Sequence, residues 1–148
     1  MTAQVQQEQV IDRPVDVVFD FVARRHVQNH PRWDPEMELE QLTEGPLGVG
    51  TIIRRRRPGH PTQPDAGPIE GTMEVVEFEP NQALGLVIRD GPVEIRSRTT
   101  YEALDDQRTL LTGHVEISGM DESADTGPMA NALKRSMRRI KQLVESEH

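Results

Sequence analysis

Residues 127–148 read GPMANALKRSMRRIKQLVESEH and form one amphipathic pattern. The apolar members recur every three or four positions, as in a helix with one buried face; they are Met129, Leu133, Met137, Ile140 and Val144. Burying these side chains is worth roughly 7 to 15 kcal/mol before entropy is counted. We therefore expect a long final helix that covers a sheet, and a curved sheet covered by one helix encloses a mostly apolar pocket.

The chain before this helix has the pattern of a sheet. Short alternating segments are separated by Gly, Pro, Asn and Asp, and the short connections predict antiparallel pairing. The expected strands are residues 5–11, 37–42, 51–57, 71–79, 83–90, 93–104 and 109–118. The polar, proline-punctuated residues 58–68 are too long for a simple turn, and we expect a mobile loop at the pocket rim.

Two short helices are expected after the first strand. Pro14 can begin a helix, because its missing N–H is harmless in the first turn. A second helical turn is expected at residues 26–29 and should end at His30, because Pro31 disfavours the helical conformation of its predecessor. With the strands and the final helix, this order predicts a single α+β domain over residues 1–148.

Composition excludes several classes of protein. The formal net charge of −8 disfavours binding to nucleic acid or to an anionic membrane surface. The absence of cysteine removes disulfides, thiolate nucleophiles and cysteine metal sites. No apolar run is long enough to span a membrane, and the N-terminus lacks the pattern of a signal peptide. We therefore expect a soluble, cytoplasmic protein without membrane insertion.

The pocket wall follows from strand alternation. Aliphatic and hydroxyl side chains alternate with more polar ones in residues 93–104, and we expect the first group to face inward. Unpaired hydroxyls are costly in a solid core but orient ligands in a pocket, although local backbone bonds could also satisfy them. His114 should face outward. The expected lining residues of these two strands are Ile95, Ser97, Thr99, Tyr101 and Val115.

Other residues can contact the ligand or simply pack. Trp33, the only tryptophan, can line the end of the pocket or fix that corner of the core. Met129, Leu133 and Met137 are expected to contact the ligand because methionine adapts to varied shapes, with ordinary packing as the alternative for Met137. His26 and His30 have a zinc-type spacing, but no third ligand is evident, so we expect no metal and no cofactor.

The run Arg54-Arg55-Arg56-Arg57 divides by parity between the two faces of a strand. An inward pair would bind an acidic group of a ligand at the pocket mouth. The alternative is an edge strand protected by charge, with arginines paired to Glu36, Glu38 or Glu40. The sequence leaves open which pair faces the pocket.

Four short motifs, in this order and spacing, resemble the polyketide cyclase/dehydrase branch of the START-like, Bet v 1-like superfamily. They are PVDVVF at residues 14–19, PRWDP at 31–35, GVGT at 48–51 and EFEP at 77–80. The resemblance implies a helix-grip fold, in which a seven-stranded antiparallel sheet wraps around a long C-terminal helix. It also implies a pocket for lipids, polyketides or other apolar molecules. That superfamily has no invariant catalytic set, so no catalytic residue is carried over.

Three functions are compatible with this domain. Binding or transport of a small hydrophobic molecule needs only the pocket. An aromatase, cyclase or dehydratase acting on a polyketide-like substrate also needs a placed acid or base, for which Tyr101, Asp34 and His26 are the candidates. A nonenzymatic module that contacts another protein is the third, and a filled interior would favour it.

Overall fold

The computed structural model of the chain describes residues 2–57, 69–119 and 127–148. These residues form one seven-stranded antiparallel sheet, which confirms the expected architecture. The loop expected at residues 58–68 lies outside the described residues. The strands are β1 (Thr2–Ile11), β2 (Glu38–Gln41), β3 (Ile52–Arg57), β4 (Ile69–Glu79), β5 (Ala83–Asp90), β6 (Val93–Asp105) and β7 (Arg108–Ser118).

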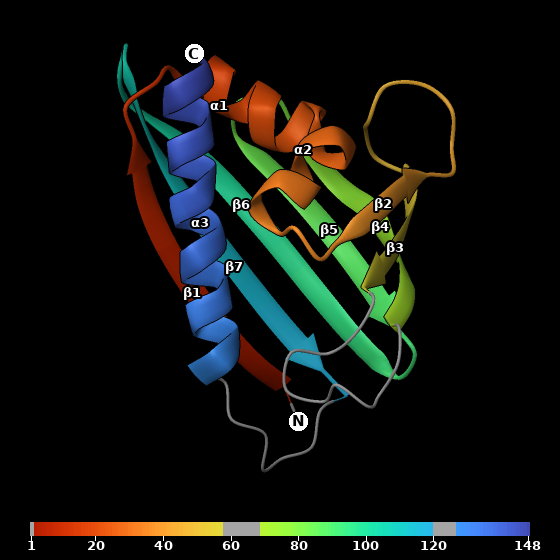
Figure 1. Ribbon diagram of the computed structural model, residues 1–148. Coiled ribbons are helices and arrows are strands. Elements are labelled where there is room, and N and C mark those ends of the chain that lie inside the picture. The colour runs from red at the N-terminus through yellow and green to blue at the C-terminus, as the bar shows by residue number, and fades with distance from the viewer. Residues whose placement is uncertain (1, 58–68, 120–126) are drawn as a thin grey trace.

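The strand order across the sheet is β1-β7-β6-β5-β4-β3-β2, so the first strand pairs with the last and β2 forms the opposite edge. The helix α3 (Gly127–Glu147) lies across one face of the sheet, here called the inner face (Figure 1). The helices α1 (Val15–Phe19) and α2 (His26–Trp33) lie at one end of the sheet, beside the C-terminal end of α3. The inner face is therefore covered from two sides.

The first strand begins earlier than expected. Thr2 pairs with Ser118 and Ala3 with Ile117, so β1 follows its partner β7 to the end of that strand. The sequence of residues 2–4 carries no apolar alternation, and this pairing is set by the neighbouring strand. The ambiguity at Val75 and Val76 is also resolved, because a register shift at this point of β4 buries Val75 and leaves Val76 exposed.

The helix pair differs from the expected one in two ways. A π-helical turn, η1 (Asp20–Arg24), follows α1, and the Asn29 side chain donates to the Phe21 carbonyl at 2.9 Å. The second helix does not end at His30 but continues through Pro31 to Trp33. Proline's fixed φ suits a helix and costs only one backbone hydrogen bond here. The burial of the Trp33 side chain offsets that loss.

The two halves of α3 are held differently. Met137, Ile140 and Val144 are buried, whereas Met129 and Leu133 in the first half are partly exposed. The C-terminal half is also tied down by polar contacts, since Glu145 accepts a hydrogen bond from the Asp12 backbone N–H at 2.8 Å. Arg32 and Glu147 form a further ion pair between α2 and α3. Only the C-terminal half of the helix is fully packed.

None of the described helices is long and apolar enough to cross a lipid bilayer.

We expect Ile140→Ala to lower the free energy of unfolding by about 2 to 5 kcal/mol, because it deletes most of a buried side chain in the fixed half of α3. Gln142→Ala, an exposed change in the same helix, is the matched control and should have little effect. Urea unfolding followed by circular dichroism measures both. Equal stability of the two variants would contradict the packing described above.

Candidate functional site

The Thr99 and Tyr101 side chains of β6 lie on the inner face of the sheet. Thr99 Oγ1 lies 2.9 Å from the Tyr101 hydroxyl, so these two groups are hydrogen-bonded to each other. Tyr101 is buried, and its ring packs edge-on against Phe19 with 5.0 Å between ring centroids. Burial raises the pKa of the Tyr101 phenol above its ordinary value, while the bond to Thr99 opposes this effect. Tyr101 is therefore a neutral hydrogen-bonding group and not a ready base.

The inner face is packed at one end and accessible at the other. Tyr101 and Leu111 are buried near α1, together with Met137 of α3. Towards the N-terminal half of α3, the inward residues of β6 and β7 keep part of their surface accessible although they face the helix. These partly exposed residues are Ile95, Ser97, Thr99 and Val115, and Leu133 and Met129 of α3 are partly exposed as well.

The arginine run divides as its parity predicts, and the structure decides which pair faces inward. Arg54 and Arg56 are exposed, and Arg54 forms an ion pair with Glu40 of β2 at 3.0 Å. Arg55 and Arg57 share the inner face with the buried Ile53. β3 is not an edge strand, because β2 and β4 pair with it on both sides. Edge protection therefore does not explain this run.

Arg55 reaches across β4 to an acid on β5. Its Nη1 lies 3.4 Å from Asp90 Oδ2, and the two side chains are only 11% and 12% exposed. Gly71 lies between them, and a Cβ there would fall 1.9 Å from Asp90 Oδ1. Burial lowers the pKa of Arg55 below its ordinary value, while Asp90 opposes that shift. The ion pair thus needs a glycine at position 71.

A chain of polar side chains connects α2 to the same part of the sheet. His26 Nδ1 lies 3.1 Å from the Val22 carbonyl oxygen, and His26 Nε2 lies 2.8 Å from His30 Nδ1. His30 Nε2 lies 3.8 Å from Asp34 Oδ2, and this carboxylate binds Arg57 at 2.9 Å. We call the six side chains the inner polar cluster; they are His26, His30, Asp34, Arg55, Arg57 and Asp90.

Burial keeps both histidines uncharged near neutral pH. It lowers the pKa of His26 to about 3, and the neighbouring His30 adds to this shift. Burial also lowers the pKa of His30, although Asp34 opposes the effect. Burial raises the pKa of Asp34, but the nearby guanidinium groups of Arg57 and Arg55 hold it below its usual range. Asp34 is therefore ionised, and both imidazoles are neutral near pH 7.

The predicted site residues fall into separate groups. His26 and Asp34 are joined through His30, whereas Tyr101 lies in the Thr99 and Phe19 group. Trp33 is 5% exposed and stacks on His30 with 5.3 Å between centroids, so it packs against the cluster. His114 lies on the outer face, as expected, beside a hollow of about 210 Å³.

Sequence reasoning named His26 and Asp34 as candidates and left open which arginine pair faces inward, but it considered His30 only as a metal ligand and did not name Asp90. The spacing of His26, His30 and Asp34 by four residues was a usable signal, because it places them on one helix face. The prediction that the helix ends at His30, before Pro31, removed Asp34 from this helix face. The inward position of Arg55 and its pairing with Asp90 have no local signal, since they depend on which strands become neighbours.

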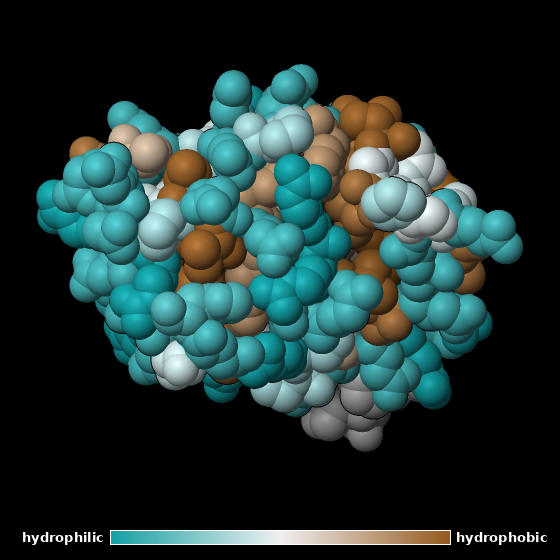
Figure 2. Space-filling model, turned by 90° about the horizontal axis from the view of Figure 1, so that it is seen from above, coloured by the Kyte–Doolittle hydropathy of each residue, from teal (hydrophilic) through white to brown (hydrophobic). Residues whose placement is uncertain are grey.

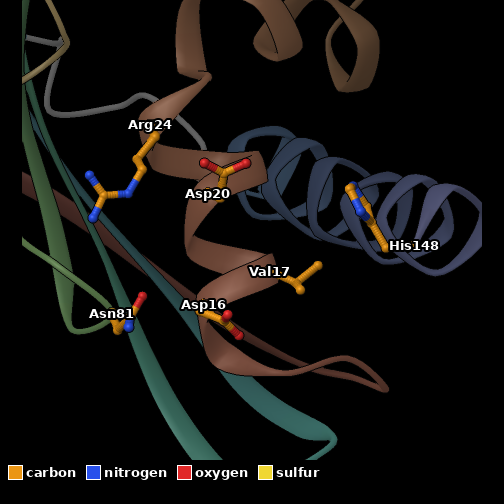
Figure 3. Close-up of a pocket in the computed structure, with 6 residues that line it drawn as sticks. All are labelled: Asp16, Val17, Asp20, Arg24, Asn81 and His148. Carbon is orange, nitrogen blue, oxygen red and sulfur yellow. The ribbon is translucent and has the colours of Figure 1, made fainter.

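A second hollow, of about 410 Å³, lies at the end of the molecule near α1 (Figure 3). Its labelled side chains come from α1, η1, the β4–β5 turn and the last residue of the chain, and they are mostly polar. Arg24 lies over the ring of Phe19, 5.4 Å from its centroid. Seen from this end, hydrophilic side chains cover most of the surface and apolar ones form separate patches (Figure 2). This hollow does not suit an apolar molecule.

We expect Gly71→Ala to destabilise the protein by about 1 to 3 kcal/mol, because the new methyl group overlaps the Asp90 carboxylate and the Arg89 carbonyl. Gly48→Ala is the matched control, since nothing lies within 4 Å of its added Cβ. Chemical unfolding of both variants tests this. A Gly71→Ala variant as stable as Gly48→Ala would mean that the ion pair does not pass over this residue.

His26 should remain uncharged when the solution is acidified from about pH 7 to about pH 5, because its pKa is about 3 in the folded protein. The unfolded chain binds this proton near pH 6.5, so His26 favours the folded state less and less as the pH falls below that value. The imidazole ¹³C shift of His26, followed by NMR across this range, provides the measurement. A midpoint near 6.5 would contradict the buried position.

The sequence matches the model of one protein family. A model of the family described as "Polyketide cyclase / dehydrase and lipid transport" matches residues 2–145. A comparison with curated proteins gives no match.

Several solved structures have the same fold. Ara h 8.0201 is 14% identical with a TM-score of 0.74, over 99% of this chain and all of the other. Truncated norcoclaurine synthase from Thalictrum flavum is 17% identical with a TM-score of 0.71, over 100% of this chain and 96% of its own. The Zhui aromatase/cyclase from Streptomyces sp. R1128 is 13% identical with a TM-score of 0.74, over 98% of this chain and 94% of its own.

At these identities the solved structures show the fold alone, and it is the Bet v 1-like helix-grip fold. Because the family model spans nearly its whole length, the chain belongs to the polyketide cyclase / dehydrase and lipid transport family.

Proposed function

We propose that the protein binds a small, mainly hydrophobic molecule between the inner face of the sheet and the N-terminal half of α3. The observation that carries this proposal is the partial exposure of Ile95, Val115 and Leu133, which face the interior. Apolar surface that stays accessible on an inward face gains about 25 cal/mol for each Å² that a ligand covers. Ser97 and Thr99, also partly exposed, add hydroxyl groups to this wall.

The two halves of α3 support this location. Ile140 and Val144 hold the C-terminal half, so the helix stays in place whether or not a ligand is bound. Met129 and Leu133 lie in the less packed half and can contact a ligand. The flexible methionine side chain adapts to ligands of different shape. Met137 is buried at 2% exposure, which favours ordinary packing for that residue.

A cyclase or dehydratase is the second candidate function, and the chain of His26, His30 and Asp34 favours it. A histidine oriented by a second histidine is a plausible base. The three residues expected to act together are nevertheless divided, since Tyr101 lies in another group and Asp34 is held by Arg57. Binding requires no such assembly, so we place it first. The partly exposed interior weighs against a module that binds only other proteins.

Val115→Phe should weaken binding of the neutral dye Nile red by about tenfold or more, because the larger ring occupies part of the proposed ligand space. Its free energy of unfolding should change by less than about 1 kcal/mol, since Val115 is not fully packed. Fluorescence titration measures the dissociation constant of the dye, and urea unfolding measures the free energy of unfolding.

Native mass spectrometry of the purified protein would reveal any ligand retained from its host.

Val76→Phe on the outer face is the matched control and should leave dye binding unchanged. If Nile red does not bind the unaltered protein, or binds both variants equally, the proposed location is wrong. If Val115→Phe is strongly destabilising, the interior is filled and the interaction module becomes the better explanation.

A further inference from the structure

The hydrogen bonds of the histidine pair have one consistent direction when both rings are neutral. His26 Nδ1 lies 3.1 Å from the Val22 carbonyl oxygen, and a carbonyl only accepts, so this nitrogen carries the proton. His26 Nε2 is then an acceptor, and His30 Nδ1, at 2.8 Å, must donate to it. The proton of His30 is therefore on Nδ1, and its Nε2 presents a lone pair.

That lone pair faces a second acceptor. His30 Nε2 lies 3.8 Å from Asp34 Oδ2, which is longer than a hydrogen bond. An ionised carboxylate and an unprotonated imidazole nitrogen both accept, so neither can satisfy the other. The His30 side chain is 17% exposed and that of Asp34 is 24% exposed, so both remain accessible. The arrangement suits a group that donates a proton to this pair.

The neighbouring charges select the kind of donor. Arg57 Nη2 lies 2.9 Å from the same Asp34 oxygen, and Arg55 is close enough to affect the pKa of Asp34. Arg55 and Arg57 are each paired with a carboxylate, so the cluster has no net charge that would attract a metal cation or an ammonium group. A hydroxyl group adds no charge to this cluster, and it can donate to the His30 lone pair while its oxygen accepts from a guanidinium N–H. Arg57 Nε is itself buried without a hydrogen-bond partner among the described residues.

The ring of His30 is held in a fixed orientation. Trp33 stacks on it with an interplanar angle of 21°, and His26 holds the opposite nitrogen. The entropy cost of fixing the His30 ring therefore arises during folding and does not weaken ligand binding. His26 and Trp33 are positioning residues for this site.

We propose that His30 Nε2, with Asp34 and Arg57 beside it, is a hydroxyl-binding site that holds a phenolic or enolic hydroxyl of the ligand. The inference rests on the proposed function, because it requires that an apolar molecule enters the interior. It assigns that molecule a chemical class, namely an apolar skeleton with an acidic hydroxyl group. His30 accepts the hydroxyl proton in a hydrogen bond, and no covalent step is involved.

Two probes of similar shape test the site. 1-Naphthol has a hydroxyl donor, whereas 1-methoxynaphthalene has the same rings and no donor. We expect the unaltered protein to bind 1-naphthol about tenfold more tightly, as for one hydrogen bond to a partly buried acceptor. His30→Phe keeps a ring against Trp33 and should abolish this preference while leaving 1-methoxynaphthalene binding unchanged. His114→Phe, on the outer face, is the control and should keep the preference.

The outcomes distinguish failure of the hydroxyl site from failure of the proposed binding function. Equal affinity of the unaltered protein for both probes, or a preference retained in His30→Phe, would overturn the hydroxyl site alone. Failure of both probes to bind would contradict the proposed function. A measurement that needs no variant is the long-range ¹H–¹⁵N NMR spectrum of the imidazoles at neutral pH. It should show His30 protonated at Nδ1, and protonation at Nε2 would overturn the inference.

Discussion

The attachment of the C-terminal half of α3 is the constraint on which the rest of the structure depends. Ile140 and Val144 are buried, and Glu145 receives a hydrogen bond from the backbone of Asp12. The helix is thus fixed at the end where α1 and α2 also pack (Figure 1). Its other half, with Leu133, packs against the sheet but is only partly buried. The less buried half of the helix is where we propose that a ligand lies.

Charges that face this interior must be paired, because an unpaired buried charge is far more costly than a buried apolar group. Arg55 is paired with Asp90, and Arg57 with Asp34. The second pair connects the sheet to α2 and brings His30 against the carboxylate. The inner face therefore has aliphatic and hydroxyl side chains on β6, aliphatic side chains on β7, and charged, hydrogen-bonding side chains where α2 meets β3.

The shared fold does not select a function. Solved structures with this fold include a protein named as an aromatase/cyclase and one named as a norcoclaurine synthase, each at less than 20% identity to this chain. One architecture can host many activities, since activity depends on the side chains of the site. For this chain those side chains are neutral imidazoles, paired charges and hydroxyls. Such groups are able to orient a ligand, and we therefore propose binding before turnover.

The sequence by itself determined the order of the elements, the antiparallel sheet and the buried face of the final helix. Hydrophobic periodicity and turn residues are local signals, and they suffice for these features. It did not determine the end of α2, because the loss at Pro31 is offset by burial of Trp33, a tertiary contact. Nor did it decide which arginines face inward. Only strand pairing brings Arg55 over Gly71 to Asp90, because these residues are separated in the chain and become neighbours through the register of β3, β4 and β5.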